Sequence, residues 1–468
     1  SEGQQALIET PSFASTMLYR YGLYLLLLAS HSFRSAIAED IVTRFDRISP
    51  FSPHLTPYPF LPREHEPSLP PINAHSRRAN SQFDITFVCP NAPQQTCRFA
   101  QQGFENAGQY ISQMISIKER VRVHATFRSF CNGRRKDRCG DMGNTLGMAL
   151  PAAYFPARPK AQSATGDDTE NTRFYLYPQS LVKQSKHDTK LDYAPYDIMA
   201  EFNSDFDFWF KSSGQTIGPN QTDFEFVATH EFTHGMGWDT SLVPFSVMYK
   251  DFSSTQNPYV APQLYLHGPI ASPSVDAWTL LTPFDKLVQD PTGKSIEAQV
   301  IPIQQWWPQG SGSLSLSSFI SSFESSGAPF SAAASLYKAI TSSTKSIALR
   351  NTTLYSTRSP GSYEPGSTLT HVDASYSNSQ DFLMVPTVGD MVGKTLDELI
   401  ARFGGRGVYG PGILDSLRLL GWEGSVELVV GKNVRDGNIA SDATRSVSTY
   451  WRSALAVGAV MTSSVFLL

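Results

Sequence analysis

The feature that most constrains this chain is the run of residues 229–238, Thr-His-Glu-Phe-Thr-His-Gly-Met-Gly-Trp. It contains the pattern H-E-x-x-H, with His230 and His234 four positions apart. On an α-helix such side chains lie on one face, one turn apart, so both imidazoles can bind a single Zn²⁺ at about 2.0–2.1 Å. Glu231 points elsewhere and can take a proton from a water on the metal. The run therefore predicts a helix that carries half of a zinc site and its general base.

The neighbouring residues predict where this helix begins and ends. Thr222 and Glu225 have the spacing of a capping box, in which each side chain bonds the backbone N–H of the other residue. We therefore expect Thr222 at the N-cap. Gly235 and Gly237 are expected to end the helix, because glycine adopts a left-handed turn without strain.

Composition and charge narrow the class of protein. The chain has 468 residues, which suits two or three domains or one large domain with insertions. Its 38 basic residues are balanced by 42 acidic ones, so no nucleic-acid partner is expected. Aromatic residues make up 12% of the chain, so a sizeable core is available and a disordered composition is excluded.

Both ends of the chain carry targeting patterns. Residues 17–38 hold a methionine, an arginine, an apolar run and Ala-Ile-Ala, the order of a secretory signal peptide. The tail, residues 426–468, ends in an apolar run preceded by a polar spacer and small residues, the order of a GPI-anchor signal with Ser441 as candidate attachment residue. A transmembrane helix is the alternative for the tail. We expect a secreted protein that is anchored at the cell surface.

The cysteines and the N-glycosylation sequons also fit a secreted protein. An even number of cysteines after a signal peptide predicts disulfides. Proximity favours Cys89–Cys97 and Cys131–Cys139, although three pairings are possible. Two N-glycosylation sequons begin at Asn220 and Asn351.

Between the two ends, the hydrophobic pattern predicts one α+β domain over residues 81–425. A Pro-rich leader or pro-segment, residues 39–80, precedes it, and a large insertion, residues 239–370, follows the H-E-x-x-H run. Apolar residues at periods of two and 3.6 predict the elements. The expected strands cover residues 83–89, 121–130, 174–177 and 196–210, and the expected helices cover residues 101–120 and 413–420.

A catalytic zinc needs three protein ligands and one open position. The compact form of the motif places the third histidine at position 240, where this chain has Thr240. Three alternatives remain: Glu297 or Glu398 from a later helix, His267, and His371. His371 is favoured because Met384 follows it within Asp-Phe-Leu-Met-Val-Pro, the pattern of a tight turn with a methionine beneath the metal.

H-E-x-x-H-x-x-G, a long insertion, a separate histidine and then D-x-L-M-x-P together resemble the leishmanolysin-type metzincins. The run is also similar to secreted proteins that carry H-E-x-x-H-G-x-G-[FW]. The resemblance covers residues 196–422. It implies a metzincin fold, with a twisted mixed sheet, an active-site helix, a Met-turn and a C-terminal helix. It also implies that His230, His234 and His371 bind one Zn²⁺, that Glu231 is the general base and that Met384 is the Met-turn residue.

The expected function is that of a secreted or cell-surface zinc endopeptidase acting on protein or peptide substrates. Three alternatives stay open. One is a surface-anchored binding or adhesion protein on a protease fold. The second is a gluzincin-type hydrolase with a glutamate as third ligand, and the third is a zinc hydrolase that acts on something other than peptides.

Overall fold

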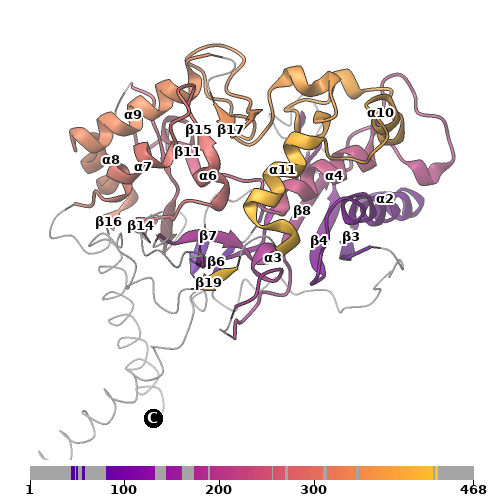
Figure 1. The fold of residues 1–468 in the computed structure, drawn as a ribbon, viewed down its shortest axis with the longest axis horizontal. Helices are drawn as coiled ribbons and strands as arrows, with labels where there is room; N and C mark the ends of the chain where they lie inside the picture. Colours follow the sequence, from indigo (N-terminus) through magenta and orange to yellow (C-terminus); the bar gives the residue numbers. More distant parts are fainter. Residues whose placement is uncertain are drawn as a thin grey trace, which may run out of the picture. The chain divides into compact units, whose positions relative to one another are not determined.

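The computed structural model describes residues 44–47, 49–50, 55–57, 81–131, 144–160, 173–187, 190–253, 255, 257–268, 272–308, 314–343, 347–424 and 427–430. This part is a mixed α+β structure, so the predicted class is confirmed (Figure 1). The predicted signal peptide, most of the leader, Cys139, Ser441 and the apolar tail lie outside the described residues. Within the described part, no helix is both long and apolar enough to cross a bilayer.

The sheet nearest the H-E-x-x-H run has four strands in the order β3-β4-β8-β5. They are β3 (Phe83–Val88), β4 (Val121–Arg128), β8 (Ile198–Asn203) and β5 (Gly147–Pro151). The first three are parallel, and β5 runs antiparallel along β8 with Ala149 opposite Ala200. In β4 every second residue is buried, as its apolar alternation predicts for a strand with one face toward the core.

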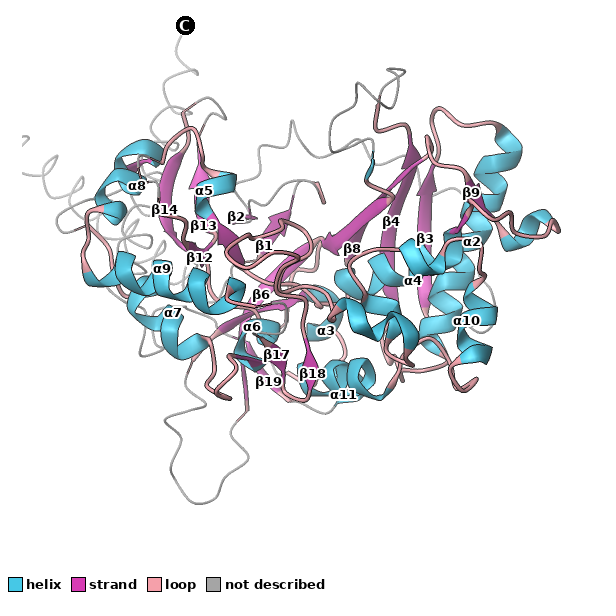
Figure 2. Ribbon diagram, turned by 90° about the horizontal axis from the view of Figure 1, so that it is seen from above, coloured by secondary structure: helices cyan, strands magenta, loops and turns pink. Residues whose placement is uncertain are grey.

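Helices α2 (Gln94–Ser112) and α4 (Phe224–Gly235) lie alongside this sheet (Figure 2). Helix α4 packs so closely on β8 that a Cβ atom on Gly235 would lie 2.4 Å from Ile198. Helices α2 and α4 meet at Gly103, where a Cβ atom would lie 2.5 Å from the ring of Phe224. Glycine at both points therefore allows the closest approach of the elements.

Aromatic rings fill the space between these helices and the sheet. Phe104 of α2 is fully buried, and its ring lies 4.8–5.9 Å from the rings of Phe202, Phe224 and Phe232. Each such side chain removes a large apolar area from water and contributes about 1.5–3 kcal/mol. This core fixes α4, and hence the two histidines it carries, against the sheet.

A second sheet has the order β19-β6-β1-β2, with β7 paired to β6. Its members are β19 (Leu428–Val430), β6 (Ala153–Pro159), β1 (Phe45–Arg47), β2 (Leu55–Pro57) and β7 (Tyr175–Pro178). The pairing of β1 with β6 joins the predicted leader to the rest of the domain. Residues 44–47 are all buried, so this part of the leader belongs to the fold.

The predicted insertion is a folded region with its own aromatic core. Helices α7 (Glu297–Gln304), α8 (Leu316–Glu324) and α9 (Ala328–Thr341) lie together in it (Figure 1). The rings of Phe319 and Phe323 in α8 lie 5.1 Å from that of Trp278, and Phe323 also lies 5.1 Å from Trp306, so the tryptophans belong to this core. Its remaining elements are β11 (Leu242–Pro244), α5 (Phe245–Met248), β12 (Val260–Pro262), β13 (Leu264–His267), β14 (Ser274–Trp278), α6 (Pro283–Leu287), β15 (Val288–Gln289), β16 (Leu314–Ser315), β17 (Ala348–Leu349) and β18 (Thr352–Thr353).

The chain after the insertion returns to α4. Helix α10 (Leu396–Arg402) is followed by α11 (Pro411–Leu420), which ends at Leu420, as predicted, before Gly421 in the left-handed region. The indole N–H of Trp422 donates to the carbonyl oxygen of Met236 at 3.0 Å. The C-terminal helix is thereby tied to the turn that follows α4.

Three sequence-based boundaries are wrong. The helix expected at 101–120 is α2, which ends at Ser112 because Ile115 and Ile117 enter the core from a loop. The strand expected at 196–210 is two strands, β8 and β9 (Phe208–Trp209), separated where Asn203 accepts the N–H of Asp205 in a local turn.

The remaining short elements are α3 (Gln179–Val182) and β10 (Thr222–Asp223).

The predicted capping box of α4 is the third error. Asp223, and not Thr222, is the N-cap, and its side chain accepts the N–H of Glu225 at 2.7 Å. Thr222 and Asp223 pair with β9 as strand β10, which extends the chain up to the first residue of the helix. The predicted end is confirmed, since Gly235 is the last helical residue and Gly237 has a φ of +104°.

Candidate metal centre

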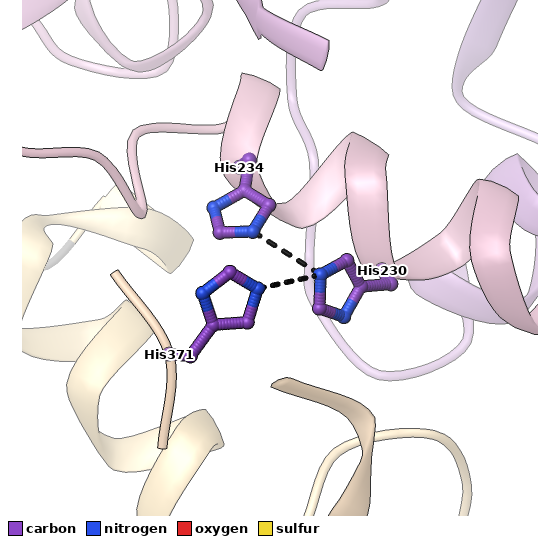
Figure 3. Close-up of side chains that lie close together, drawn as sticks. All are labelled: His230, His234 and His371. Carbon is purple, nitrogen blue, oxygen red and sulfur yellow. Dashed lines mark hydrogen bonds between the residues drawn. The ribbon is translucent and has the colours of Figure 1, made fainter. Parts of the chain in front are cut away.

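Helix α4 carries two of the predicted ligands on one face. His230 and His234 are 8% and 7% exposed, and both side chains face the segment around His371 (Figure 3). His371 lies after the insertion and is 6% exposed. Its carbonyl oxygen accepts the N–H of Tyr355 at 2.7 Å, which ties it to the end of the insertion. The structure thus brings His371 beside two histidines from which a long insertion separates it in the sequence.

Each histidine is oriented by a backbone carbonyl that faces its Nδ1 atom. The distances are 2.7 Å from His230 to the oxygen of Leu383, 2.8 Å from His234 to that of Trp238, and 3.2 Å from His371 to that of Ser367. A carbonyl oxygen can only accept, so each Nδ1 carries the proton. Each Nε2 is left with its lone pair, the form in which imidazole binds a metal.

The three Nε2 atoms converge. Those of His230 and His371 lie 3.1 Å apart, and those of His234 and His230 lie 3.2 Å apart (Figure 3). A tetrahedral zinc with bonds of about 2.0–2.1 Å holds its ligand atoms about 3.3 Å apart, so the observed spacing fits this metal. Three lone pairs facing one another repel unless a cation lies between them. The three residues are therefore close enough to hold a metal ion.

Burial keeps these imidazoles neutral. It lowers the pKa of His230 to about 4 and the pKa of His234 to about 3, and it takes the pKa of His371 well below the usual 6.5. The neighbouring histidines lower the pKa of His234 and His371 further. Neutral imidazoles at pH 7 are ready to bind a metal without first losing a proton.

Glu231 is directed toward the edge strand of the sheet. The backbone N–H of Ala149 in β5 donates to its Oε2 at 3.0 Å. Burial raises the pKa of Glu231 to about 8, and the bond from Ala149 works in the opposite direction. A cation on the adjacent histidines would lower this pKa, because positive charge stabilises the carboxylate. The carboxylate of Glu231, the residue after His230, is thus held by a backbone group that cannot move independently of the sheet.

The other candidate third ligands are engaged elsewhere. Glu297 accepts from Arg173 and from Tyr175, both at 2.8 Å. Glu398 forms the capping box of α10 with Thr395, and His267 lies 2.9 Å from Asp276. Among the described residues, the one group of ligand side chains close enough to share a metal is His230, His234 and His371.

The predicted Met-turn is a short 3₁₀ turn, η7 (Phe382–Met384), that is completely buried. Leu383 within it accepts from His230, and the carbonyl oxygen of Met384 accepts the N–H of Val372 at 2.8 Å. The turn therefore contacts both the first histidine and the residue after the third. This backbone contact, rather than the methionine side chain alone, links the turn to the site.

The remaining site predictions concern the cysteines and the two glycosylation sequons. Cys89 and Cys97 form the predicted disulfide, with their Cα atoms 5.9 Å apart. The predicted Cys131–Cys139 pair involves a residue outside the described part. Asn220 and Asn351 are both exposed, as acceptors of a glycan must be.

The sequence did not identify the backbone groups of the site. The carbonyl oxygens of Leu383, Trp238 and Ser367 and the N–H of Ala149 orient the side chains, yet every residue type carries these groups. One further residue, Asp239, could have been noticed from the sequence, because it is a carboxylate directly after residues 229–238. It is buried and bonded to Tyr154 at 2.9 Å.

Fold and site together define an α+β protein with three buried histidines able to hold a metal ion. The chain belongs to the SPBPB7E8-like family, whose profile matches residues 71–454. It is also similar to a protein of Schizosaccharomyces pombe, "Uncharacterized protein PB7E8.01", with 24% identity over 189 residues. That similarity covers 39% of this chain and spans 31% of the relative's length. No solved structure matches the chain.

Proposed function

We propose that this protein is a zinc-dependent endopeptidase of the metzincin type. The observation that carries the proposal is the convergence of three Nε2 atoms, with those of His371 and His234 at 3.1 and 3.2 Å from that of His230. Each ring is oriented by a carbonyl at its Nδ1. Glu231 beside them supplies the carboxylate that such a hydrolase requires. The buried turn Phe382–Met384 under His230 is what favours a metzincin over other zinc hydrolases.

His230, His234 and His371 would hold the zinc. When bound, it acts as a Lewis acid on the scissile carbonyl and lowers the pKa of a bound water to about 7. Glu231 accepts the proton of the attacking water and later delivers it to the leaving amine. The N–H of Ala149 keeps the carboxylate in place during both transfers.

The edge of strand β5 supports a peptide as the substrate. Among the described strands, β5 pairs only with β8, so its other edge has no strand partner there. The N–H of Ala149 points from that edge to Glu231. An extended peptide adding to such an edge would pass the three histidines with its backbone hydrogen-bonded. The disulfide Cys89–Cys97 fits a protein that works outside the reducing cytosol.

The test compares three proteins for zinc content and for hydrolysis of a mixed peptide library. Wild type is expected to bind one zinc and to cleave peptides. Glu231→Gln should keep the zinc and lose about 10²–10⁴-fold in rate, because only the proton transfer is removed. His371→Ala should lose both. Zinc binding without any peptide cleavage would contradict the endopeptidase, and a zinc-free wild type would contradict the metal site itself.

A further inference from the structure

The segment after His234 is joined to the N-terminal strand β1 by a buried ionic network. Arg47 of β1 donates from Nη2 to the hydroxyl of Tyr154 at 3.2 Å. That hydroxyl donates to Asp239 at 2.9 Å, and Arg47 lies 3.8 Å from the same carboxylate oxygen. The side chain of Arg47 is 2% exposed and that of Asp239 is 12% exposed. The two charges therefore neutralise each other in a place that water hardly reaches.

This network acts on the group that orients His234. The carbonyl oxygen that faces Nδ1 of His234 belongs to Trp238, and it lies in the same planar peptide unit as the backbone nitrogen of Asp239. Fixing Asp239 therefore fixes the direction of this carbonyl. Thr282 adds a second restraint by donating to the carbonyl oxygen of Asp239 at 2.9 Å.

The two faces of β1 have different partners. Phe45 and Arg47 point to the same side, because side chains alternate along a strand. Phe45 stacks on Tyr265 of the insertion at 4.6 Å, so this side of β1 contacts both the insertion and Asp239. Arg44 lies on the other side, where it donates to Asp46 at 2.6 Å. Arg44 is also buried, and it bonds Asp46 and the carbonyl oxygen of Asp192, which makes it the matched control arginine.

We infer that Arg47 is a positioning residue of the zinc site, acting on His234 through Asp239 and Trp238. It follows that β1 stays with the mature protein, so that removing residues 39–80 as a pro-segment would damage the site rather than release it. Because Arg47 acts here on the proposed zinc site, its role rests on the proposed function. Its test measures zinc affinity, which does not depend on whether peptides are cleaved.

The experiment uses the full chain and titrates zinc against a chelator of known affinity. Arg47→Met should weaken zinc binding about 10–100-fold, the usual effect of losing a group that orients a metal ligand. Arg44→Met should change it less than about twofold, since its partners lie away from Asp239. Adding Asp239→Asn to Arg47→Met should recover part of the loss, because no unpaired buried carboxylate then remains.

Tyr154→Phe is the second variant, and it tests the inference even if Arg47→Met does not fold. It removes one hydroxyl and keeps the ring, so zinc affinity should fall about 2- to 10-fold, the worth of one hydrogen bond. Urea unfolding of the metal-free proteins separates the two roles. If Arg47→Met and Tyr154→Phe lower stability but leave zinc affinity unchanged, Arg47 is structural and the inference is wrong. Equal losses in Arg44→Met and Arg47→Met would also overturn it, and a zinc-free wild type would overturn it together with the proposed function.

Discussion

The imidazole of His230 donates from Nδ1 to the carbonyl oxygen of Leu383 at 2.7 Å. This bond joins the helix of the H-E-x-x-H run to the turn Phe382–Met384. The same turn bonds Val372, the neighbour of His371, through the carbonyl oxygen of Met384. One short turn therefore contacts the histidine that precedes the insertion and the segment that follows it.

The first prediction concerns Asp381, which precedes this turn. It accepts the N–H groups of Gly412 and Ile413 at 3.2 and 2.8 Å and so caps the N-terminus of α11. Asp381→Ala should lower the free energy of unfolding by about 1–2 kcal/mol and weaken zinc binding, because the turn loses its anchor. Urea unfolding and chelator titration measure the two effects.

Asp415→Ala is the control for this prediction. Asp415 lies on the same helix, and its side chain is 71% exposed. Such a substitution at the surface should change the free energy of unfolding by less than about 0.5 kcal/mol. If both variants lower the free energy of unfolding equally, the hydrogen bonds of Asp381 to α11 contribute no more stability than an exposed aspartate does.

The second prediction concerns Gly235. Replacing a helical glycine with alanine usually stabilises a protein by up to about 1 kcal/mol. Here the new methyl group would lie 2.4 Å from Ile198, so the helix must move away from the sheet. Gly235→Ala should therefore destabilise, by about 1–3 kcal/mol as in other overpacked cores. Urea midpoints at constant m-value measure the change.

Ile198→Ala provides the test of the cause. Alone it should cost stability by leaving a cavity, about 2–5 kcal/mol. Combined with Gly235→Ala it should cost less than the sum, because the added methyl group then has room. Strict additivity would show that the two residues do not press on each other.

The parts that sequence predicted correctly are those in which a few adjacent residues determine the structure. The alternation in β4, the glycine turn after α4 and the pairing of Cys89 with Cys97 are of this kind. His371 could be selected because Met384 follows closely behind it. His371 then lies beside the two histidines of α4, and the turn that contains Met384 bonds His230 through the carbonyl oxygen of Leu383.

The parts that sequence missed depend on distant partners. Thr222 and Asp223 are equally suited to cap a helix, and the pairing of β10 with β9 decides between them. Strand β1 has only three residues and lies in a Pro-rich stretch, so no periodicity marks it as part of a sheet. The role of Arg47 can be recognised only once the fold places its side chain beside Asp239.

The third prediction follows from Glu225 in the first turn of α4. This carboxyl is 1% exposed, accepts from the side-chain amide of Asn106, and has its pKa raised by burial from 4.5 to about 7. Between pH 4.5 and 7 the folded protein keeps a proton that the unfolded chain has released. Stability therefore falls as the pH rises through this window, by at most about 3 kcal/mol.

Glu225→Gln removes the titration and keeps the acceptor for Asn106. It should be nearly neutral at pH 4 and should stabilise most at pH 7.5, measured by urea unfolding at each pH. Glu119→Gln, at an exposed position, is the control and should change the free energy of unfolding by less than about 0.5 kcal/mol. A Glu225→Gln gain that is the same at pH 4 and pH 7.5 would contradict burial of the charged form as the cause.

The last prediction concerns removal of the metal. A ligand that binds only the folded protein stabilises it, by about 2.7 kcal/mol when its free concentration is 100 times Kd. A chelator should therefore lower the Tm of wild type, and added zinc should restore it. His371→Ala should have a low Tm that responds to neither reagent, because one of three converging Nε2 atoms is missing. His267→Ala is the control and should keep the full response, since His267 pairs with Asp276 outside the histidine group. A response retained in His371→Ala but lost in His267→Ala would place the metal in the insertion and reverse the assignment of the third ligand.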